Sequence, residues 1–516
     1  MANKSIFSAV SRTLPKADTL NRTGAPAFAY DASHALAQIA MTGTFNAGYY
    51  SGGEVQLQEL LNAAHEVDTE FLAQTAVYAR RNGRMKDAPA VLLAVLSARD
   101  TVLFHRVFDR VVDNGKMLRN FVQIMRSGAV GRTSLGTAAK RRVQDWLINA
   151  SDWQLLNAAI GNQPSLADVI KMVHPKADTP ERNAFFAWIM GKPCDFAKLP
   201  KSVQQYMMLK DTGHGVLPDV PFQMLTALSL DAKRWAKIAE RGSWQMIRMN
   251  LNTFARHGVF NMKRSTKLIA DRLANTTEIR KAKVMPYQLF AASLHAGKNL
   301  PESVRNALNS AMEVAVSNVP SVKGRVVVCP DVSASMNWSI SGYRQGATSK
   351  MRCVDVAALT AAAFLRANKD VRVMPFDTRA YEPSIKRSLS VAEVAKDLAG
   401  YGGGGTDCTA PLQRMINRKV APDLVVMISD NQSWAHLGDG RTTPMMQAWN
   451  ELKRQNRKAK LVCIDIAPYG TSQAQTREDI LNVGGFSDAV FDVIARFAAG
   501  ENGSEFWVDE IRKIEV

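Results

Sequence analysis

Hydrophobic and polar positions follow two different patterns along the chain, and the change falls near residue 320. From residue 54 to residue 319, apolar residues recur every three to four positions, which predicts amphipathic helices. Many of these segments end at pairs such as Asn82 and Gly83, which are typical of helix C-termini. One long helix is expected over 88–112. The helices are short and numerous, so we expect stacked antiparallel pairs, an α-solenoid, although the sequence shows no regular repeat.

The second pattern, from about residue 324, alternates short apolar runs with helical segments. Strands that alternate with helices of this length form a doubly wound, mostly parallel sheet. Phe506, Trp507 and Val508 are expected to add a strand near the C-terminus. The four predicted strands of the sheet cover residues 326–328, 371–376, 424–429 and 461–466.

Length and composition indicate a globular protein of more than one domain. The chain has 516 residues, of which 46% are hydrophobic and 22% are charged. We expect a flexible N-terminus over 1–20, a helical domain over 21–320 and an α/β domain over 321–516. No secretory leader and no apolar stretch long enough to span a bilayer is present, and the five cysteines include no C-x-x-C pair. These features predict a cytoplasmic protein.

The positive charge is concentrated in the first part of the chain. The net charge is +18, but residues 321–516 contain 25 Lys and Arg against 22 Asp and Glu, so residues 1–320 have a net charge of +15. A basic surface of this size attracts polyanions, most often nucleic acid. The alternative is a basic face that only contacts solvent.

Side-chain oxygens follow the strands of the predicted sheet. Pro330 is expected to end the first strand, because proline lacks a backbone donor, and the motif Asp331-Val332-Ser333-Ala334-Ser335 comes next. Open α/β sheets bind ligands at the carboxyl ends of their strands, and carboxylate and hydroxyl oxygens suit a hard divalent cation. The alternative is that the two serines cap a helix. Two further oxygens come from Thr406 in a glycine-rich loop and from Asp430 at a second strand end. The predicted ligands of a Mg²⁺ ion are Asp331, Ser333, Ser335, Thr406 and Asp430.

This set of oxygens resembles the metal-ion-dependent adhesion site of von Willebrand factor A domains. Further stretches resemble the bacterial Ro proteins, in which a TROVE module of helical repeats precedes such a domain. They are residues 42–54 (TGTFNAGYYSGGE), 131–147 (GRTSLGTAAKRRVQDWL), 174–176 (HPK), 284–296 (VMPYQLFAASLHA), 404–412 (GGTDCTAPL), 428–434 (ISDNQSW) and 492–497 (DVIARF).

The resemblance implies a non-catalytic RNA-binding protein. Its HEAT-type helical repeats would close into a ring-like α-solenoid whose basic central hole takes single-stranded 3′ ends of misfolded or damaged RNA, while small structured Y-like RNA binds the outer face. The outer face would include Lys171, His174 and Lys176. The candidates that face the hole, assigned by charge and position, are Arg132, Lys140, Arg141, Arg248 and Arg256. We further expect a monomer that works with an exoribonuclease or an RNA repair ligase.

Two other functions are compatible with the residues. In one, the metal site binds an acidic residue of a partner protein, and the basic face is incidental. In the other, the chain is a chelatase-type accessory subunit of an ATPase ring, which would leave the basic helical part without a role. An enzyme is not expected, because no Ser-His-Asp order, paired-carboxylate signature or GxxxxGK[ST] loop is present.

Overall fold

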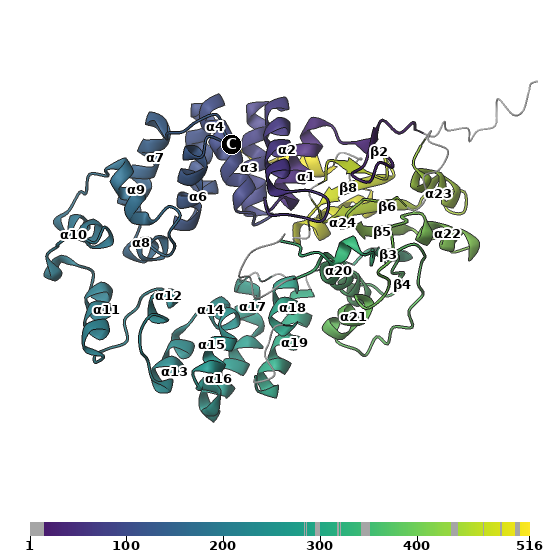
Figure 1. Ribbon diagram of the computed structural model, residues 1–516. Coiled ribbons are helices and arrows are strands. Elements are labelled where there is room, and N and C mark those ends of the chain that lie inside the picture. The colour runs from purple at the N-terminus through teal and green to yellow at the C-terminus, as the bar shows by residue number, and fades with distance from the viewer. Residues whose placement is uncertain are drawn as a thin grey trace, which may run out of the picture. The chain divides into compact units, whose positions relative to one another are not determined.

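The computed structural model describes residues 15–282, 284, 286–294, 300–316, 319, 321–341, 351–434, 442–467, 469–485, 488–500 and 506–516 (Figure 1). The chain divides into two compact units. The first consists of residues 1–63, 285–291 and 312–510, and the second consists of residues 64–284, 292–311 and 511–516. The predicted combination of a helical part and an α/β part is confirmed. In the described residues, no helix is both long and apolar enough to cross a membrane.

Helices make up the second unit, as the three-to-four spacing predicts. Successive helices pack against each other, with α3 against α4 and α5 and with α4 against α6. Phe104, Phe108 and Phe121 form an aromatic cluster with ring centroids 5.5–5.9 Å apart. The helices are α3 (Thr69–Arg81), α4 (Asp87–Arg99), α5 (Thr101–Val111), α6 (Gly115–Arg126), α7 (Gly136–Asn149), α8 (Asp152–Ala158), α9 (Leu166–Val173), α10 (Pro180–Ile189), α11 (Lys201–Thr212), α12 (Phe222–Leu225), α13 (Ala232–Arg241), α14 (Trp244–Met249), α15 (Leu251–Arg256), α16 (Lys263–Leu273) and α17 (Thr276–Ala282). Short 3-10 helices lie between α10 and α11, at η1 (Phe196–Lys198), and between α15 and α16, at η2 (Val259–Asn261).

The helix expected over 88–112 is two helices, so that prediction was wrong. Asp100 ends α4, where its backbone N–H donates to the Leu96 carbonyl at 2.9 Å. The same residue begins α5, because its carboxylate accepts the backbone N–H groups of Val102 and Leu103, both at 3.0 Å. An aspartate side chain competes for backbone donors and therefore favours a helix start over a helix interior.

A five-stranded parallel sheet forms the centre of the first unit, in the order β4-β3-β5-β6-β8 (Figure 1). The strands are β3 (Val326–Pro330), β4 (Val371–Val373), β5 (Leu424–Ser429), β6 (Lys460–Asp465) and β8 (Ile480–Gly484), and they are almost wholly buried. The associated helices are α20 (Cys353–Ala367), α21 (Val391–Leu398), α22 (Ala410–Asn417), α23 (Pro444–Leu452) and α24 (Asp488–Ala499). The doubly wound sheet predicted from the alternating pattern is confirmed. The ladder does not end at Pro330, however, since this residue still pairs with Ile428 in register.

Residues near the N-terminus belong to the first unit. Strand β2 (Pro26–Ala29) pairs with β1 (Thr19–Leu20) on one side and with β7 (Thr471–Ser472) on the other, in antiparallel register. Helix α1 (Ala32–Thr42) packs on β8. Of the N-terminus predicted to be flexible, residues 1–14 lie outside the described residues, and Thr19–Leu20 form a strand because β2 supplies a partner.

Four of the described helices cross a boundary between the two units. Helices α2 (Gly53–Glu66), α18 (Pro286–Leu294), α19 (Glu302–Val316) and α25 (Phe506–Arg512) each contribute residues to both units. The strand predicted at residues 506–508 was wrong, because these residues begin α25 and bury Trp507, which is 1% exposed. An aromatic run indicates burial but does not distinguish a short strand from a helix.

Candidate metal site and basic surface

The loops that leave β3 and β5 bring four of the predicted metal ligands together. Asp331, Ser333, Ser335 and Asp430 are 0–5% exposed. The Asp331 backbone N–H donates to the carbonyl of Ile428 on β5 at 2.9 Å, which brings the two strand ends together. The Asp331 carboxylate accepts the Ser333 backbone N–H at 2.8 Å, and the hydroxyls of Ser333 and Ser335 lie 3.2 Å apart. The Asp-x-Ser-x-Ser loop therefore presents its oxygens as one cluster.

The glycine-rich loop places Thr406, 1% exposed, beside the same cluster. Gly403 donates its N–H to the Val332 carbonyl at 2.8 Å, and Ala334 donates to the Gly404 carbonyl at 2.9 Å. Gly402 has φ +72°, and a Cβ there would lie 2.5 Å from the Val332 side chain, so this approach requires glycine. The Thr406 carbonyl accepts the N–H of Trp434, which follows β5. These backbone hydrogen bonds connect the three loops that carry the five predicted oxygen ligands.

Two buried carboxylates face each other in this cluster. Burial raises the pKa of the Asp331 carboxyl, and the charge of Asp430 raises it further. Burial also raises the pKa of Asp430. Among the described residues, neither carboxylate forms an ion pair with a lysine or an arginine, and no group of three or more His, Cys, Asp or Glu residues could hold a metal. Two uncompensated negative charges next to hydroxyl groups fit a hard divalent cation.

Two residues that the sequence reasoning missed lie close to these loops. Asp465 ends β6, is 0% exposed, and has one carboxylate oxygen, Oδ2, without a hydrogen-bond partner in the described part of the chain. Its position after the apolar run of residues 461–464 repeats the pattern of Asp430, so a rule based on strand ends could have found it. The other residue is Tyr50, whose backbone N–H donates at 3.2 Å to the hydroxyl of Tyr469, a residue that lines a small pocket together with Ser335 and Asp430. No pattern in the sequence relates residue 50 to residue 335.

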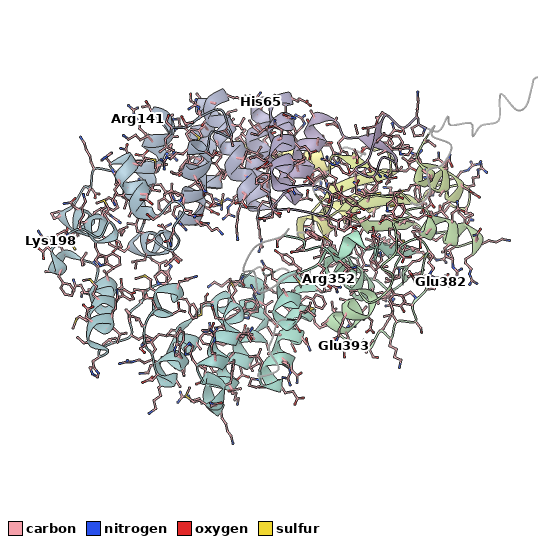
Figure 2. All side chains as sticks on the ribbon, viewed as in Figure 1. His65, Arg141, Lys198, Arg352, Glu382 and Glu393 are labelled. Atoms are coloured by element: carbon pink, nitrogen blue, oxygen red, sulfur yellow. The ribbon has the colours of Figure 1, made fainter. Side chains whose placement is uncertain are left out.

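Five of the predicted RNA-binding residues lie around α7 and the C-terminal end of α9. The two helices are joined by Gln144, whose Nε2 donates to the carbonyl of Val173 at 2.6 Å. Lys140 lies one helical turn before Gln144 on the same face of α7. His174 has φ +51° and ends α9, as expected for a cap. The five residues are Lys140, Arg141, Lys171, His174 and Lys176. Arg141 is exposed (Figure 2).

The other three predicted residues are Arg132, Arg248 and Arg256. Arg132 lies at the start of α7, where its guanidinium is 3.2 Å from the position that a Cβ on Gly136 would take. Arg248 and Arg256 belong to α14 and α15, which Figure 1 shows well separated from α7 and α9. Arg248 donates to the Gln245 side chain at 3.4 Å, whereas Arg256 is exposed. These two residues therefore lie apart from the other six.

Several of these cations have no acidic partner. Nearby arginines of the same unit are paired, as in Arg80 with Asp113 at 2.7 Å and Arg182 with Asp152 at 3.6 Å. In contrast, six of the predicted residues form no ion pair with a described acidic residue. They are Arg132, Lys140, Arg141, Lys171, Lys176 and Arg256. Their charge is available to an anionic ligand.

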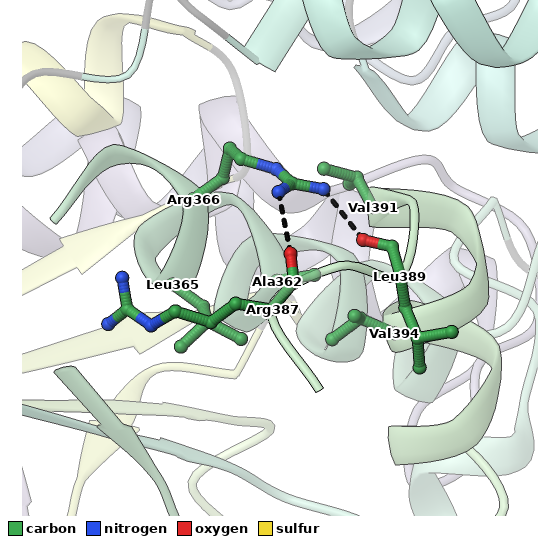
Figure 3. Close-up of a pocket in the computed structure, with 7 residues that line it drawn as sticks. All are labelled: Ala362, Leu365, Arg366, Arg387, Leu389, Val391 and Val394. Atoms are coloured by element: carbon green, nitrogen blue, oxygen red, sulfur yellow. Dashed lines mark hydrogen bonds between the residues drawn. The ribbon is translucent and has the colours of Figure 1, made fainter. Parts of the chain in front are cut away.

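A small pocket between α20 and α21 has a structural explanation. It has a volume of about 70 Å³ and is lined by aliphatic side chains and two arginines (Figure 3). The Arg366 guanidinium donates to the carbonyls of Arg387 at 3.0 Å and of Leu389 at 2.7 Å. Arg387 in turn donates to the carbonyl of Asn368 at 3.2 Å. Both cations are thus used to hold the connection between the two helices.

The five-stranded sheet of the first unit lies within residues that match a von Willebrand factor A domain. Residues 325–498 match the family described as the Ro60 vWA domain. The whole chain is similar to the RNA-binding protein RO60 of Deinococcus radiodurans, with 23% identity over 93% of this chain and 95% of that protein. The predicted resemblance to bacterial Ro proteins is therefore confirmed.

Two further comparisons give the extent of this similarity. The RNA-binding protein RO60 of Caenorhabditis elegans is 23% identical over 50% of this chain and 40% of its own length. The crystal structure of the D. radiodurans RO (RSR) protein matches with a TM-score of 0.60 and 20% identity, over 92% of this chain and 100% of that one. The fold is therefore shared along nearly the whole chain.

Proposed function

We propose that this chain is a non-catalytic RNA-binding protein of the Ro type. The observation that supports the proposal best is the location of the charge. Residues 64–284, the main segment of the second unit, contain 34 Lys and Arg against 19 Asp and Glu, which is a net charge of +15. The rest of residues 1–320 is neutral, and several of the cations on α7 and α9 lack acidic partners. An RNA phosphate backbone is a polyanion that such a surface attracts.

The proposed ligands are RNAs with single-stranded parts. Y-like RNA would bind at the end of α9, through Lys171, His174 and Lys176, and 3′ ends of misfolded RNA would bind at the remaining arginines and lysines. Unpaired strands suit this surface because their phosphates are accessible without the geometry of a duplex. We place this activity in RNA quality control in the cytoplasm, with an exoribonuclease or an RNA repair ligase acting on the bound RNA.

The metal site provides a second proposed activity. Asp331 and Asp430 would hold Mg²⁺ together with the hydroxyls of Ser333, Ser335 and Thr406. The cation would supply an open coordination position for an oxygen of a ligand, because two carboxylates leave its charge only just neutralised. The buried and mutually repelling carboxylates support this proposal. An acidic side chain of a partner protein is the ligand that fits such a position.

Fluorescence anisotropy with a labelled single-stranded RNA tests the RNA-binding proposal. The test variant is Lys140→Gln/Arg141→Gln, which removes two cations without acidic partners from α7. The control is Lys369→Gln/Lys396→Gln, which removes the same charge from exposed positions of the other unit. For a site with about four phosphate contacts, raising salt from 50 to 200 mM should weaken wild-type binding roughly fifty-fold, since the log–log slope is about −0.7 per phosphate.

The two variants should differ in the salt dependence of binding. If each cation neutralises one phosphate, the test variant should lose about 1.4 from the magnitude of the slope, and the control should lose none. An equal loss in both variants would show that net charge alone attracts the RNA. Binding that does not change with salt would exclude the proposal.

A further inference from the structure

A fourth loop lies beside the three loops that carry the predicted metal ligands. We call residues 374–380, which follow β4, the β4 loop. Because β3 and β4 are parallel neighbours, their carboxyl ends meet at the same edge of the sheet. The Phe376 backbone N–H donates to the Pro330 carbonyl at 3.0 Å, and its carbonyl accepts the Val332 N–H at 2.8 Å. The β4 loop is therefore bound to the chain on both sides of Asp331.

Asp377 is the residue of the β4 loop that contacts the glycine-rich loop. It is 4% exposed, and its carboxylate accepts three hydrogen bonds from described residues. One oxygen, Oδ1, accepts the Arg379 backbone N–H at 3.1 Å. The other, Oδ2, accepts the Gly404 backbone N–H and the Tyr381 hydroxyl, both at 3.1 Å. A buried carboxylate needs such donors to replace water, so this contact holds the side chain in one position.

The same residue binds the glycine-rich loop a second time, on the other side of Thr406. The Asp377 carbonyl accepts the Asp407 backbone N–H at 2.9 Å. Thr406 therefore lies between two backbone groups, those of Gly404 and Asp407, that both donate to Asp377. The Trp434 N–H adds a bond to the Thr406 carbonyl at 3.1 Å. Asp377, which is not among the predicted ligands, thus fixes the backbone on both sides of one of them.

Four consecutive glycines make this support necessary. Residues 402–405 are all glycine, and glycine loses more conformational freedom on folding than any other residue, so the loop would not hold Thr406 in one place by itself. The carboxylate of Asp377 also packs closely against the loop. A Cβ on Gly404 would lie 3.0 Å from its Oδ2, and a Cβ on Gly402 would lie 3.2 Å from it. The glycines allow this approach, and the carboxylate supplies the hydrogen bond.

We propose that Asp377 is a positioning residue of the metal site, which holds the Thr406 hydroxyl where a cation can bind it. The inference rests on the proposed function of the five oxygens as cation ligands. Removing a group that positions a metal ligand typically weakens metal binding about ten- to hundred-fold. Asp377→Asn keeps the shape of the side chain but turns one oxygen into an NH₂ group. Since each oxygen accepts a backbone N–H, one of these donors would then face another donor.

Binding of Mn²⁺ to the full-length protein tests the inference, with the free ion measured by electron paramagnetic resonance. Asp377→Asn should weaken binding about ten-fold or more. Asp377→Glu keeps the negative charge but moves the carboxylate by one methylene group, so it should weaken binding as well. Asp397→Asn is the control, because it removes the same charge from an exposed position on α21. This control should bind Mn²⁺ as the wild type does.

A double-mutant cycle shows whether Asp377 acts through Thr406. Thr406→Ala removes the hydroxyl that the contact is proposed to hold. Adding Asp377→Asn to this variant should therefore weaken Mn²⁺ binding by no more than about two-fold. Losses that multiply in the double variant would show that Asp377 acts independently of Thr406, and would refute the inference.

The remaining outcomes separate the inference from the proposal on which it rests. If the wild type does not bind Mn²⁺, the metal site is wrong, and the inference fails with it. If the wild type binds and either Asp377→Asn or Asp377→Glu binds equally well, the metal site stands and the positioning role is refuted. Should the Asp377 variants fold poorly, Gly404→Ala tests the same contact without a change of charge, because its methyl group would push Oδ2 away. It should weaken Mn²⁺ binding too, and unchanged binding would refute the inference.

Discussion

A buried histidine makes the stability of the first unit sensitive to mild acid. His34 in α1 is 3% exposed, and its ring stacks on Tyr30 with centroids 4.2 Å apart and planes 7° apart. The Trp507 ring also contacts His34, with centroids 5.3 Å apart and planes 79° apart. Its Nε2 has no hydrogen-bond partner in the described part of the chain. Burial lowers the pKa of His34 from 6.5 to about 4, against a small opposing effect of Asp31.

The sign of the effect follows from which state binds the proton. Below pH 6.5 the histidine of the unfolded chain is protonated, whereas the folded protein keeps His34 neutral down to about pH 4. The unfolded state therefore binds more protons in this window, and the free energy of unfolding falls as the pH falls. At pH 5.5, one unit below the unfolded pKa, His34 alone should remove about 1.4 kcal/mol.

The variant His34→Phe isolates this contribution, because a phenyl ring can stack on Tyr30 but cannot be protonated. Urea denaturation at pH 7.5 and pH 5.5 gives the free energy of unfolding for each protein. Between the two pH values the wild type should lose about 1.4 kcal/mol more than the variant. His65→Phe is the control, since it removes an exposed histidine on α2 (Figure 2) in place of a buried one. Equal losses in the wild type and His34→Phe would refute the reasoning.

Two further perturbations follow from close contacts in the structure. A Cβ on Gly115 would lie 2.1 Å from the Cβ of Ala158, so Gly115→Ala should destabilise the helical unit by about 1–3 kcal/mol in thermal unfolding. Adding Ala158→Gly should recover part of this loss, and strictly additive losses would contradict the contact. Asp430→Asn should stabilise the protein without Mg²⁺, because it removes the repulsion with Asp331. At Mg²⁺ one hundred times its Kd, the wild type should gain about 2.7 kcal/mol and the variant almost nothing, and equal gains would argue against the site.

The parts of the fold that sequence reasoning recovered are those with a strong local signal. The strands ending at Pro330, Ser429 and Asp465 are runs of mostly apolar residues in which valine and isoleucine are frequent, and such runs in a parallel sheet are buried on both faces. The metal ligands were predicted because each follows a strand end or a run of glycines, and they stay a prediction. The break between α4 and α5 at Asp100 was not predicted, because a single aspartate is a weaker signal than the regular spacing of apolar residues on both sides of it.

The contacts of residues 44–51 could not have been predicted, for a physical reason. The sequence predicts a loop over residues 46–53, and nothing in its composition indicates what the loop contacts. Its position depends on two tertiary contacts of the neighbouring residues: β2 adds to β7, and α1 packs on β8. A pairing between residues 28 and 472 has no local signature, because the register of such short strands is set by the surfaces they bury and not by their own sequence.

The same contacts bring residues 46–49 to the predicted metal site. Asn46, Gly48 and Tyr49 line a small pocket together with Ser335 and Asp430, so this part of the chain limits the space beside these oxygens. Two buried carboxylates are unfavourable without a cation, because burial and their mutual repulsion both disfavour the charged form. A cation bound there would neutralise them, so cation binding should stabilise the first unit.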